Sequence, residues 1–243
     1  MPNQRSSPHR AWPTRAAEYV SRCVLETICR LGARRLLRIE TEGLSWVPRG
    51  GPVILACRHY HYLYDGLALM NTVPRRVSLM VALDWVKDPT TRKLMAAGCR
   101  VARFPVVMRG PRPGYPPNPL GLRAERAASP RPGARAALDL LRDGRLLVIF
   151  PEGYPTIDPI ATVKTSLDEI LPFRSGFVTL AAMARREGIP PVPIIPVGLR
   201  YREGKPWRLT IRFGAPLYLT PGTDRRELLT SVEARVRELS RAP

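Results

Sequence analysis

Two of the three histidines of this chain lie near one carboxylate, in the segment 58–66. His61 and Asp65 are four residues apart, so a helix that begins here places them on one face. A carboxylate in that position fixes the tautomer of an imidazole and stabilises its protonated form, as general-base chemistry requires. His59 precedes Asp65 by six residues and reaches it only through a non-helical turn. We therefore expect a histidine base here, with His61 preferred over His59; the alternative is an ordinary surface or capping contact.

Two later segments add groups that can bind a substrate. An apolar run at 146–150 ends in Pro151-Glu152-Gly153, where proline stops a strand and glycine lets the backbone approach a ligand. Phe173-Arg174-Ser175-Gly176 opens the next predicted helix, whose amino end attracts anions. Taken singly, each segment is equally typical of a turn between a strand and a helix.

The elements that must position these residues alternate between strands and helices, which predicts an α/β fold with a mixed sheet flanked by helices. The expected strands are 53–57, 77–83, 101–108 with an interruption at Pro105, 145–150, 192–200 and 208–213. The expected helices are 14–39, 90–97, 134–141, 177–186 and 223–241. The proline-rich segment 110–133 is expected to be a long loop. We expect a polar amino terminus and a basic amphipathic helix over 1–40, followed by a single α/β domain over 41–243.

The expected amino-terminal helix carries Val20, Val24, Ile28 and Leu31 at helical spacing, together with several arginines. A basic amphipathic helix of this kind can lie in a lipid headgroup layer. Packing of the apolar stripe on the core of the domain is an equally good interpretation of the same pattern.

The composition describes a folded, strongly basic protein. The chain has 243 residues, of which 44% are hydrophobic, and a formal net charge of +19, which favours anionic partners. Its four cysteines lack zinc-site spacing, and no metal is expected. Neither a secretory signal nor a long apolar run is visible, so we expect a cytoplasmic protein, peripheral on the inner face of an anionic membrane. No zinc-finger, RNP-type or P-loop pattern accompanies the charge, and no nucleic-acid partner is expected.

In this order, the segments resemble the glycerolipid acyltransferase family, which includes the 1-acylglycerol-3-phosphate acyltransferases. The family carries a histidine and an aspartate in the form N-H-x4-D, a glycine and arginine block, F-P-E-G, and a late V-P-x-x-P. The matching segments here are His59 or His61 with Asp65, 98–109 with Arg103, Phe150-Pro151-Glu152-Gly153, and Val192-Pro193-Ile194-Ile195-Pro196.

The chain departs from the family pattern at two places. Five residues separate His59 from Asp65 and three separate His61 from Asp65, so neither histidine reproduces the spacing of four. Tyr154-Pro155-Thr156 stands where the family places an arginine soon after the glycine of F-P-E-G. Arg103, Arg109 or Arg174 can supply the missing cation.

The resemblance implies transfer of a fatty acyl group from an acyl thioester, acyl-CoA or acyl-carrier protein, to the hydroxyl of a lysophospholipid. The expected acceptor is 1-acyl-sn-glycerol-3-phosphate, and the process is phospholipid biosynthesis. In this interpretation His61 is the base and Asp65 stabilises its protonated form. No cofactor is expected, and the acyl thioester is a co-substrate. The acceptor is expected to contact Pro151, Glu152, Gly153 and the three candidate arginines, and aromatic side chains can border the acyl groove: Tyr60, Tyr62, Tyr64 and Trp85. The alternative is a non-catalytic basic module that binds membrane or nucleic acid on a degenerate acyltransferase scaffold.

Overall fold

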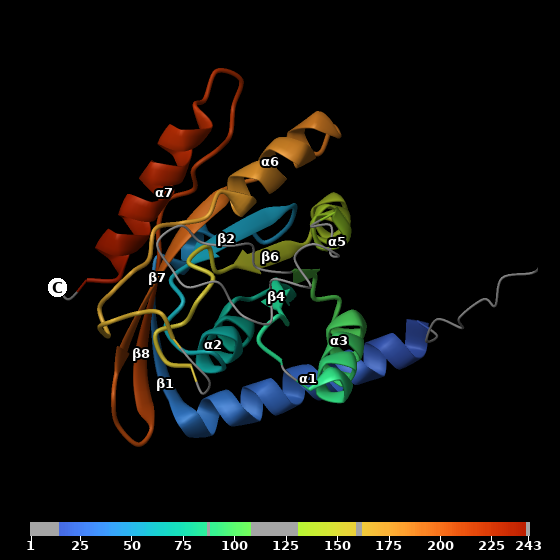
Figure 1. Cartoon of the computed structure of the whole chain (residues 1–243), viewed down its shortest axis with the longest axis vertical. Coiled ribbons are helices and arrows are strands. Elements are labelled where there is room, and N and C mark those ends of the chain that lie inside the picture. The colour runs from blue at the N-terminus through green and yellow to red at the C-terminus, as the bar shows by residue number, and fades with distance from the viewer. Residues whose placement is uncertain (1–14, 87, 108–130, 159–161, 242–243) are drawn as a thin grey trace, which may run out of the picture.

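A six-stranded sheet forms the centre of the protein (Figure 1). The computed structural model describes residues 15–86, 88–107, 131–158 and 162–241. The strands of the sheet are β1 (Leu37–Glu42), β2 (Val53–Cys57), β3 (Val77–Leu79), β6 (Leu146–Ile149), β7 (Ile194–Arg202) and β8 (Trp207–Phe213). Two short strands, β4 (Val81–Ala82) and β5 (Val106–Val107), pair separately. The helices are α1 (Arg15–Leu36), α2 (Tyr64–Thr72), α3 (Pro89–Ala102), α5 (Arg131–Arg142), α6 (Gly176–Arg186) and α7 (Arg225–Leu239), with a 3₁₀ turn, η1 (Leu44–Trp46).

The strand order of the sheet is β1-β8-β7-β2-β6-β3. β7, β2, β6 and β3 pair in parallel, whereas β8 pairs antiparallel with β7 and parallel with β1. The sheet is therefore mixed, as the sequence predicts. The parallel strands β2 and β6 end side by side at the same end of the sheet. In sheets of this type, ligands bind at the carboxyl ends of the strands.

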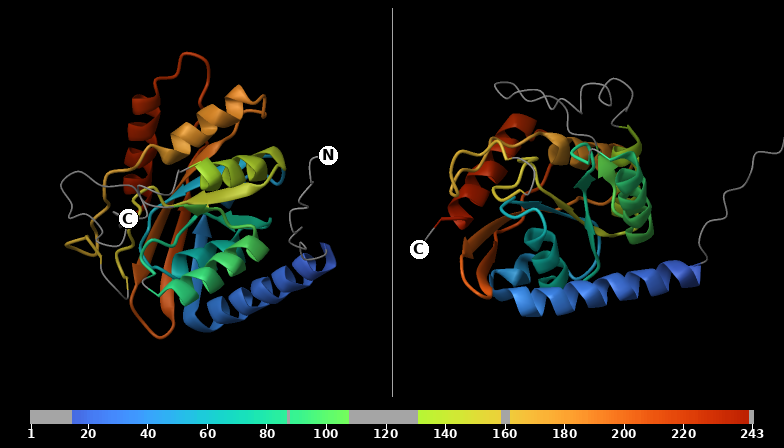
Figure 2. Two further views of the ribbon diagram at one scale, coloured as in Figure 1. Left: turned by 45° about the vertical axis from the view of Figure 1, so that its right-hand side comes forward. Right: turned by 60° about the horizontal axis from the view of Figure 1, so that its bottom comes forward.

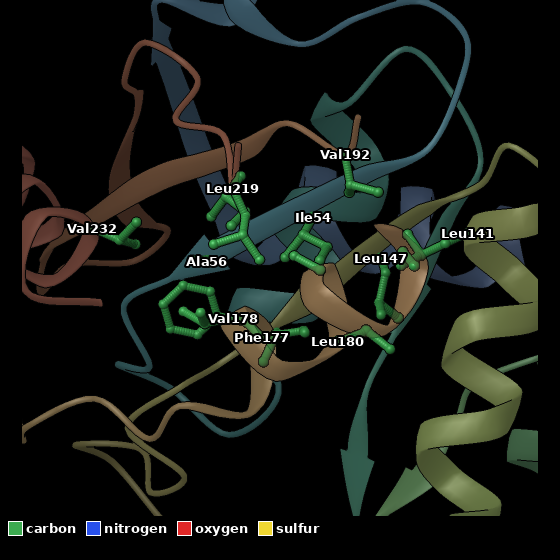
Figure 3. Close-up of a cluster of buried hydrophobic side chains, with 14 of the residues drawn as sticks. Ile54, Ala56, Leu141, Leu147, Phe177, Val178, Leu180, Val192, Leu219 and Val232 are labelled. Atoms are coloured by element: carbon green, nitrogen blue, oxygen red, sulfur yellow. The ribbon is translucent and has the colours of Figure 1, made fainter. Parts of the chain in front are cut away.

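Side chains of β2 alternate between two buried clusters, one on each face of the sheet. Ile54 and Ala56 pack with residues of α5, α6 and α7 in the cluster shown in Figure 3. Val53, Leu55 and Cys57 pack on the other face, with α2 among their neighbours. All five side chains are fully buried, so β2 reads as a continuous apolar run, as is typical of a parallel strand covered on both faces.

Helix α1 lies along the outside of the molecule, against α2 and α3 (Figure 2). Ala33, near its carboxyl end, is buried, whereas Val20, Val24, Ile28 and Leu31 are each more than half exposed. The apolar stripe that the sequence reveals therefore does not pack on the core. No helix in the described part of the chain is long and apolar enough to span a membrane.

Several predicted elements differ from the structure. The strand expected over 77–83 is divided into β3 and β4, which belong to different sheets. Residues 101–108 were expected to form a strand, but α3 continues to Ala102 and only Val106–Val107 are extended. Asp88 caps α3 by accepting from the amide of Thr91, and a left-handed Arg103 ends it, so the local signals favour a longer helix. The amino-terminal helix ends at Leu36, and the following residues form β1, which crosses the expected boundary at residue 40. Most of the expected loop 110–133 lies outside the described residues, and α5 begins at Arg131.

Gly198 allows α7 to pack on β7. A Cβ atom at this position would lie 2.4 Å from the backbone carbon of Leu239. We expect Gly198→Ala to lower the free energy of unfolding by about 1–3 kcal/mol, because the helix must shift away from the sheet. Urea denaturation measures the change. Gly98→Ala, in a helix with open space around the added methyl, is the control and should be neutral or stabilising; equal losses in both variants would contradict the packing argument.

Candidate active site

The ends of two neighbouring parallel strands bring together the residues that the sequence singles out. β2 ends at Cys57 and leads into His59, and β6 ends at Ile149 and leads into the segment 150–153. The two strands pair directly, with Ala56 opposite Ile149. The ring of Phe150 stacks on the imidazole of His59 at a centroid distance of 4.2 Å.

His59, not His61, presents its ring to Asp65. Its Nδ1 lies 2.9 Å from Oδ2 of Asp65. With the proton on Nδ1, the imidazole donates to the carboxylate and leaves Nε2 as the basic nitrogen. The His59 side chain is 16% exposed, while that of Asp65 is 1% exposed, so a half-buried base rests on a fully buried carboxylate.

The carboxylate of Asp65 is held by three further donors. The amide of Tyr60 donates to Oδ2 at 2.7 Å, and that of His61 lies 3.1 Å from both oxygens. The hydroxyl of Tyr201, from β7, donates to Oδ1 at 2.8 Å. Burial, followed by the charge of Asp65, raises the pKa of Tyr201 well above its ordinary value, so this hydroxyl stays a donor. Asp65 is thus oriented toward His59 by the loop that carries the histidine.

The expected pairing of the His61 ring with Asp65 is wrong. Helix α2 begins at Tyr64, after His61, so the two residues do not share a helical face. Nδ1 of His61 instead lies within hydrogen-bond distance of the amides of Leu63 and Tyr64, at 3.2 and 3.3 Å, and accepts from them at the start of the helix. Burial lowers the pKa of His61, which favours the neutral ring that this acceptor role requires.

Glu152 is enclosed by protein groups, in contrast to the expected substrate contact. Its side chain is fully buried, and Oε1 accepts from the amide of His59 at 2.6 Å. Oε2 accepts from the amide of Leu171 at 2.9 Å and lies 2.6 Å from Nζ of Lys164. The carboxylate of the F-P-E-G motif therefore positions the backbone of the histidine loop.

Lys164, which no sequence pattern marks, completes this arrangement. Its Nζ donates to the carbonyl of His59 at 2.7 Å and to the hydroxyl of Thr156 at 3.1 Å. The backbone of His59 is thus held on its N–H side by Glu152 and on its C=O side by Lys164. Burial lowers the pKa of Lys164, and the charge of Glu152 opposes that shift. Glu152 could be found from the sequence because it follows the apolar run of a strand, whereas Lys164 lies in a segment without periodicity. The only sequence signal for Lys164 is indirect: no arginine follows Gly153, so another residue must supply the positive charge.

Two apolar cavities open on His59. The first, of about 350 Å³, lies between the β6 loop and α6 and is lined by Pro151, Phe177 and Leu180 among others. The second, of about 410 Å³, lies toward α2 and α3 and is lined by Leu67, Trp85 and Phe104 among others. Five residues line both: His59, Met80, Ala82, Phe150 and Gly153. The imidazole therefore lies where two apolar spaces meet.

The three candidate arginines have different positions. Arg174 lines the first cavity and is the only Lys or Arg among the described residues that line either one. Arg103 lies elsewhere, in an ion pair with Asp143 on the surface at 2.9 Å. Arg109 lies outside the described residues. Of the aromatic candidates, Tyr62 and Trp85 line the second cavity, whereas Tyr64 stacks on His61 and Tyr60 on Tyr201.

A sequence profile of the family described as Acyltransferase matches residues 38–200, which is more than half of the chain. The chain belongs to this acyltransferase family. The fold is similar to that in the crystal structure of the 1-acyl-sn-glycerophosphate (LPA) acyltransferase PlsC from Thermotoga maritima, with a TM-score of 0.60 and 16% identity over 94% of this chain and 82% of that one. A search of curated proteins finds no match.

The family membership that the four sequence blocks predicted is confirmed, as is the mixed α/β fold. In the described residues of this acyltransferase, no cluster of three or more His, Cys, Asp or Glu side chains is arranged to hold a metal ion. The chemistry that the described residues offer is that of a histidine and carboxylate pair between two apolar cavities.

We expect Lys164→Met to destabilise this acyltransferase by about 3–5 kcal/mol, because it leaves the buried charge of Glu152 without its counter-ion. Chemical denaturation measures the loss. Lys93→Met, at an exposed position of α3, is the matched control and should change the stability little. The double variant Lys164→Met/Glu152→Gln should recover part of the loss. A Lys164→Met protein as stable as the control would show that the pair does not hold the loop.

Proposed function

We propose that the protein transfers a fatty acyl group from an acyl thioester to the hydroxyl of a lysophospholipid, with His59 as the general base. The observation that carries this proposal is the geometry of His59, whose Nδ1 is bonded to the buried Asp65 while its ring lines both apolar cavities. The family membership supports acyl transfer. The acceptor 1-acyl-sn-glycerol-3-phosphate and the donor, acyl-CoA or acyl-carrier protein, belong to the proposal.

In the proposed reaction Nε2 of His59 takes the proton of the acceptor hydroxyl as its oxygen attacks the thioester carbonyl. Asp65 stabilises the imidazolium that forms, since its carboxylate is fixed by four donors and need not reorganise. The tetrahedral intermediate expels the thiolate, which receives the proton from His59. The products are an ester and a free thiol, and no covalent acyl-enzyme is required.

The two cavities provide space for the two apolar parts of such substrates. The second cavity has no Lys or Arg among its described lining residues and suits the acyl chain of the donor. The first cavity has Arg174 on its wall, and a guanidinium binds phosphate oxygens in bidentate fashion. We assign the phosphorylated acceptor to the first cavity on this basis, and its hydroxyl then meets the thioester at His59.

The exposed apolar stripe of α1 supports the proposal that the protein acts at the surface of a lipid bilayer. Val24 and Ile28 are more than half exposed, and Arg34 and Arg35 are exposed near the end of the same helix. An apolar stripe beside basic side chains is typical of helices that lie in the headgroup region of anionic membranes. We propose that α1 lies against such a surface, where lysophospholipid substrates reside.

We expect His59→Asn to lower kcat for acyl transfer by about 10²–10⁴-fold, because the amide can still donate to Asp65 but has no basic nitrogen. The measurement is acceptor-dependent thiol release from a long-chain acyl thioester with lysophosphatidic acid. His61→Asn, whose amide oxygen can still accept at the start of α2, is the matched control and should retain most of the activity. Full activity of His59→Asn would reject His59 as the base, and absence of thiol release by the unmodified protein would favour the non-catalytic membrane module.

The proposed role of α1 has its own test. We expect Ile28→Asp to weaken sedimentation with phosphatidylglycerol vesicles by about tenfold, because the charge must be removed from an apolar contact. Leu94→Asp, at a highly exposed position on α3, is the control and should sediment like the unmodified protein. Equal binding by the two variants would show that α1 does not contact the bilayer.

A further inference from the structure

A third cavity, separate from the two at His59, is lined by five arginines. It has a volume of about 590 Å³ and lies between the end of β7, the end of α7 and the loop before α6. No described residue lines both this cavity and either of the two at His59. Its lining arginines are Arg58, Arg200, Arg202, Arg237 and Arg241.

Two of these arginines are built into the fold. Arg58 is 3% exposed, and its guanidinium donates to the carbonyls of Leu199 and Leu167. Its Nε–H is also buried and finds no partner among the described residues. Arg237 pairs with Glu233 at 2.8 Å. These contacts fix the positions of two guanidinium groups at the wall, and that of Arg237 is paired with Glu233.

Of the other three arginines, Arg200 and Arg202 also line a neighbouring cavity together with Glu40 and Glu42. Among the described residues, no carboxylate lies within ion-pair distance of Arg200, Arg202 or Arg241. Asp168 is the one acidic residue in the described lining, and it is exposed. Several guanidinium groups that converge on one space repel each other unless an anion lies between them. The described lining of the cavity carries five arginines and one carboxylate, and this excess of positive charge favours an anionic ligand.

We propose that this arginine cavity is a binding site for a phosphate group. Guanidinium forks match the oxygens of a phosphate and bind them in pairs, and a doubly charged group satisfies several of them at once. The volume exceeds that of phosphate alone and falls in the range of sites for small organic ligands. The phosphate can belong to a soluble phosphorylated compound or to a lipid headgroup.

Two residues that line the cavity, Tyr60 and Tyr201, also donate hydrogen bonds to Asp65 of the proposed catalytic pair. Their rings stack on each other with centroids 4.7 Å apart. The donors to Asp65 are the amide of Tyr60 and the hydroxyl of Tyr201. The guanidinium of Arg58 lies over the Tyr60 ring at 5.1 Å. A ligand in this cavity can therefore contact residues that are themselves hydrogen-bonded to Asp65. The proposal itself rests on the cavity and does not require acyl transfer.

The test compares two double variants with the same change of charge. Arg200→Gln/Arg202→Gln removes charge from the cavity, while Arg225→Gln/Arg226→Gln removes it from the opposite end of α7. Binding of inorganic phosphate and of glycerol 3-phosphate is measured by calorimetry at constant ionic strength. Binding to vesicles that contain phosphatidic acid is measured by sedimentation, with phosphatidylcholine vesicles as the blank.

We expect the cavity variant to bind phosphate at least about tenfold more weakly than the unmodified protein, and the control variant to bind it normally. A selective loss with the soluble compounds identifies a soluble ligand, and a selective loss with vesicles alone identifies a headgroup. Equal losses in both variants, or no saturable binding of any probe, would overturn the proposal. Arg241→Gln, near the end of the chain, gives the same comparison if the double variant does not fold.

Discussion

The geometry of the candidate active site depends on the buried ion pair between Glu152 and Lys164. Burying two opposite charges away from solvent costs desolvation free energy. Here hydrogen bonds from and to backbone groups offset part of that cost. Glu152 accepts from the amides of His59 and Leu171, and Lys164 donates to the carbonyl of His59. The pair thereby joins the β2 loop, the β6 loop and the segment before α6. A histidine on a flexible loop would lose much of its alignment, and this pair supplies the rigidity that alignment requires.

Asp65 depends on the same loop for its position. The chain turns after His59 so that the amides of Tyr60 and His61 point at the carboxylate. Residues 59–62 also pair with the segment after Gly153, through the bridge between His61 and Ile157. One short stretch of backbone thus carries the ring of His59 and holds its partner. The nonstandard spacing of five residues is accommodated because α2 begins only at Tyr64.

Much of the fold follows from local patterns in the sequence, and the site follows less completely. The apolar runs at 53–57 and 146–150 predict β2 and β6 because strands buried on both faces need no alternation. The spacing could not predict which histidine pairs with Asp65, because both histidines lie within six residues of it in the sequence. The conformation of the turn after His59 determines which ring reaches the carboxylate. Lys164 was missed for a similar reason. Its contact with Glu152 joins segments twelve residues apart through a loop, and no periodic pattern records such a contact.

The segment after Gly153 shows how the departure from the family pattern is compensated. Tyr154-Pro155-Thr156 carries no arginine, and the cation nearest to Glu152 is Lys164, whose side chain is fully buried and bonded to Glu152, His59 and Thr156. A side chain with these partners is unavailable to a substrate phosphate. In the proposed reaction Arg174 binds the substrate phosphate instead. Arg174 lines the first cavity, and its amide donates to the carbonyl of Pro151. In the proposed reaction the stabilising cation, Lys164, and the substrate-binding cation, Arg174, are therefore separate residues, and a change in one should leave the charge at the other intact.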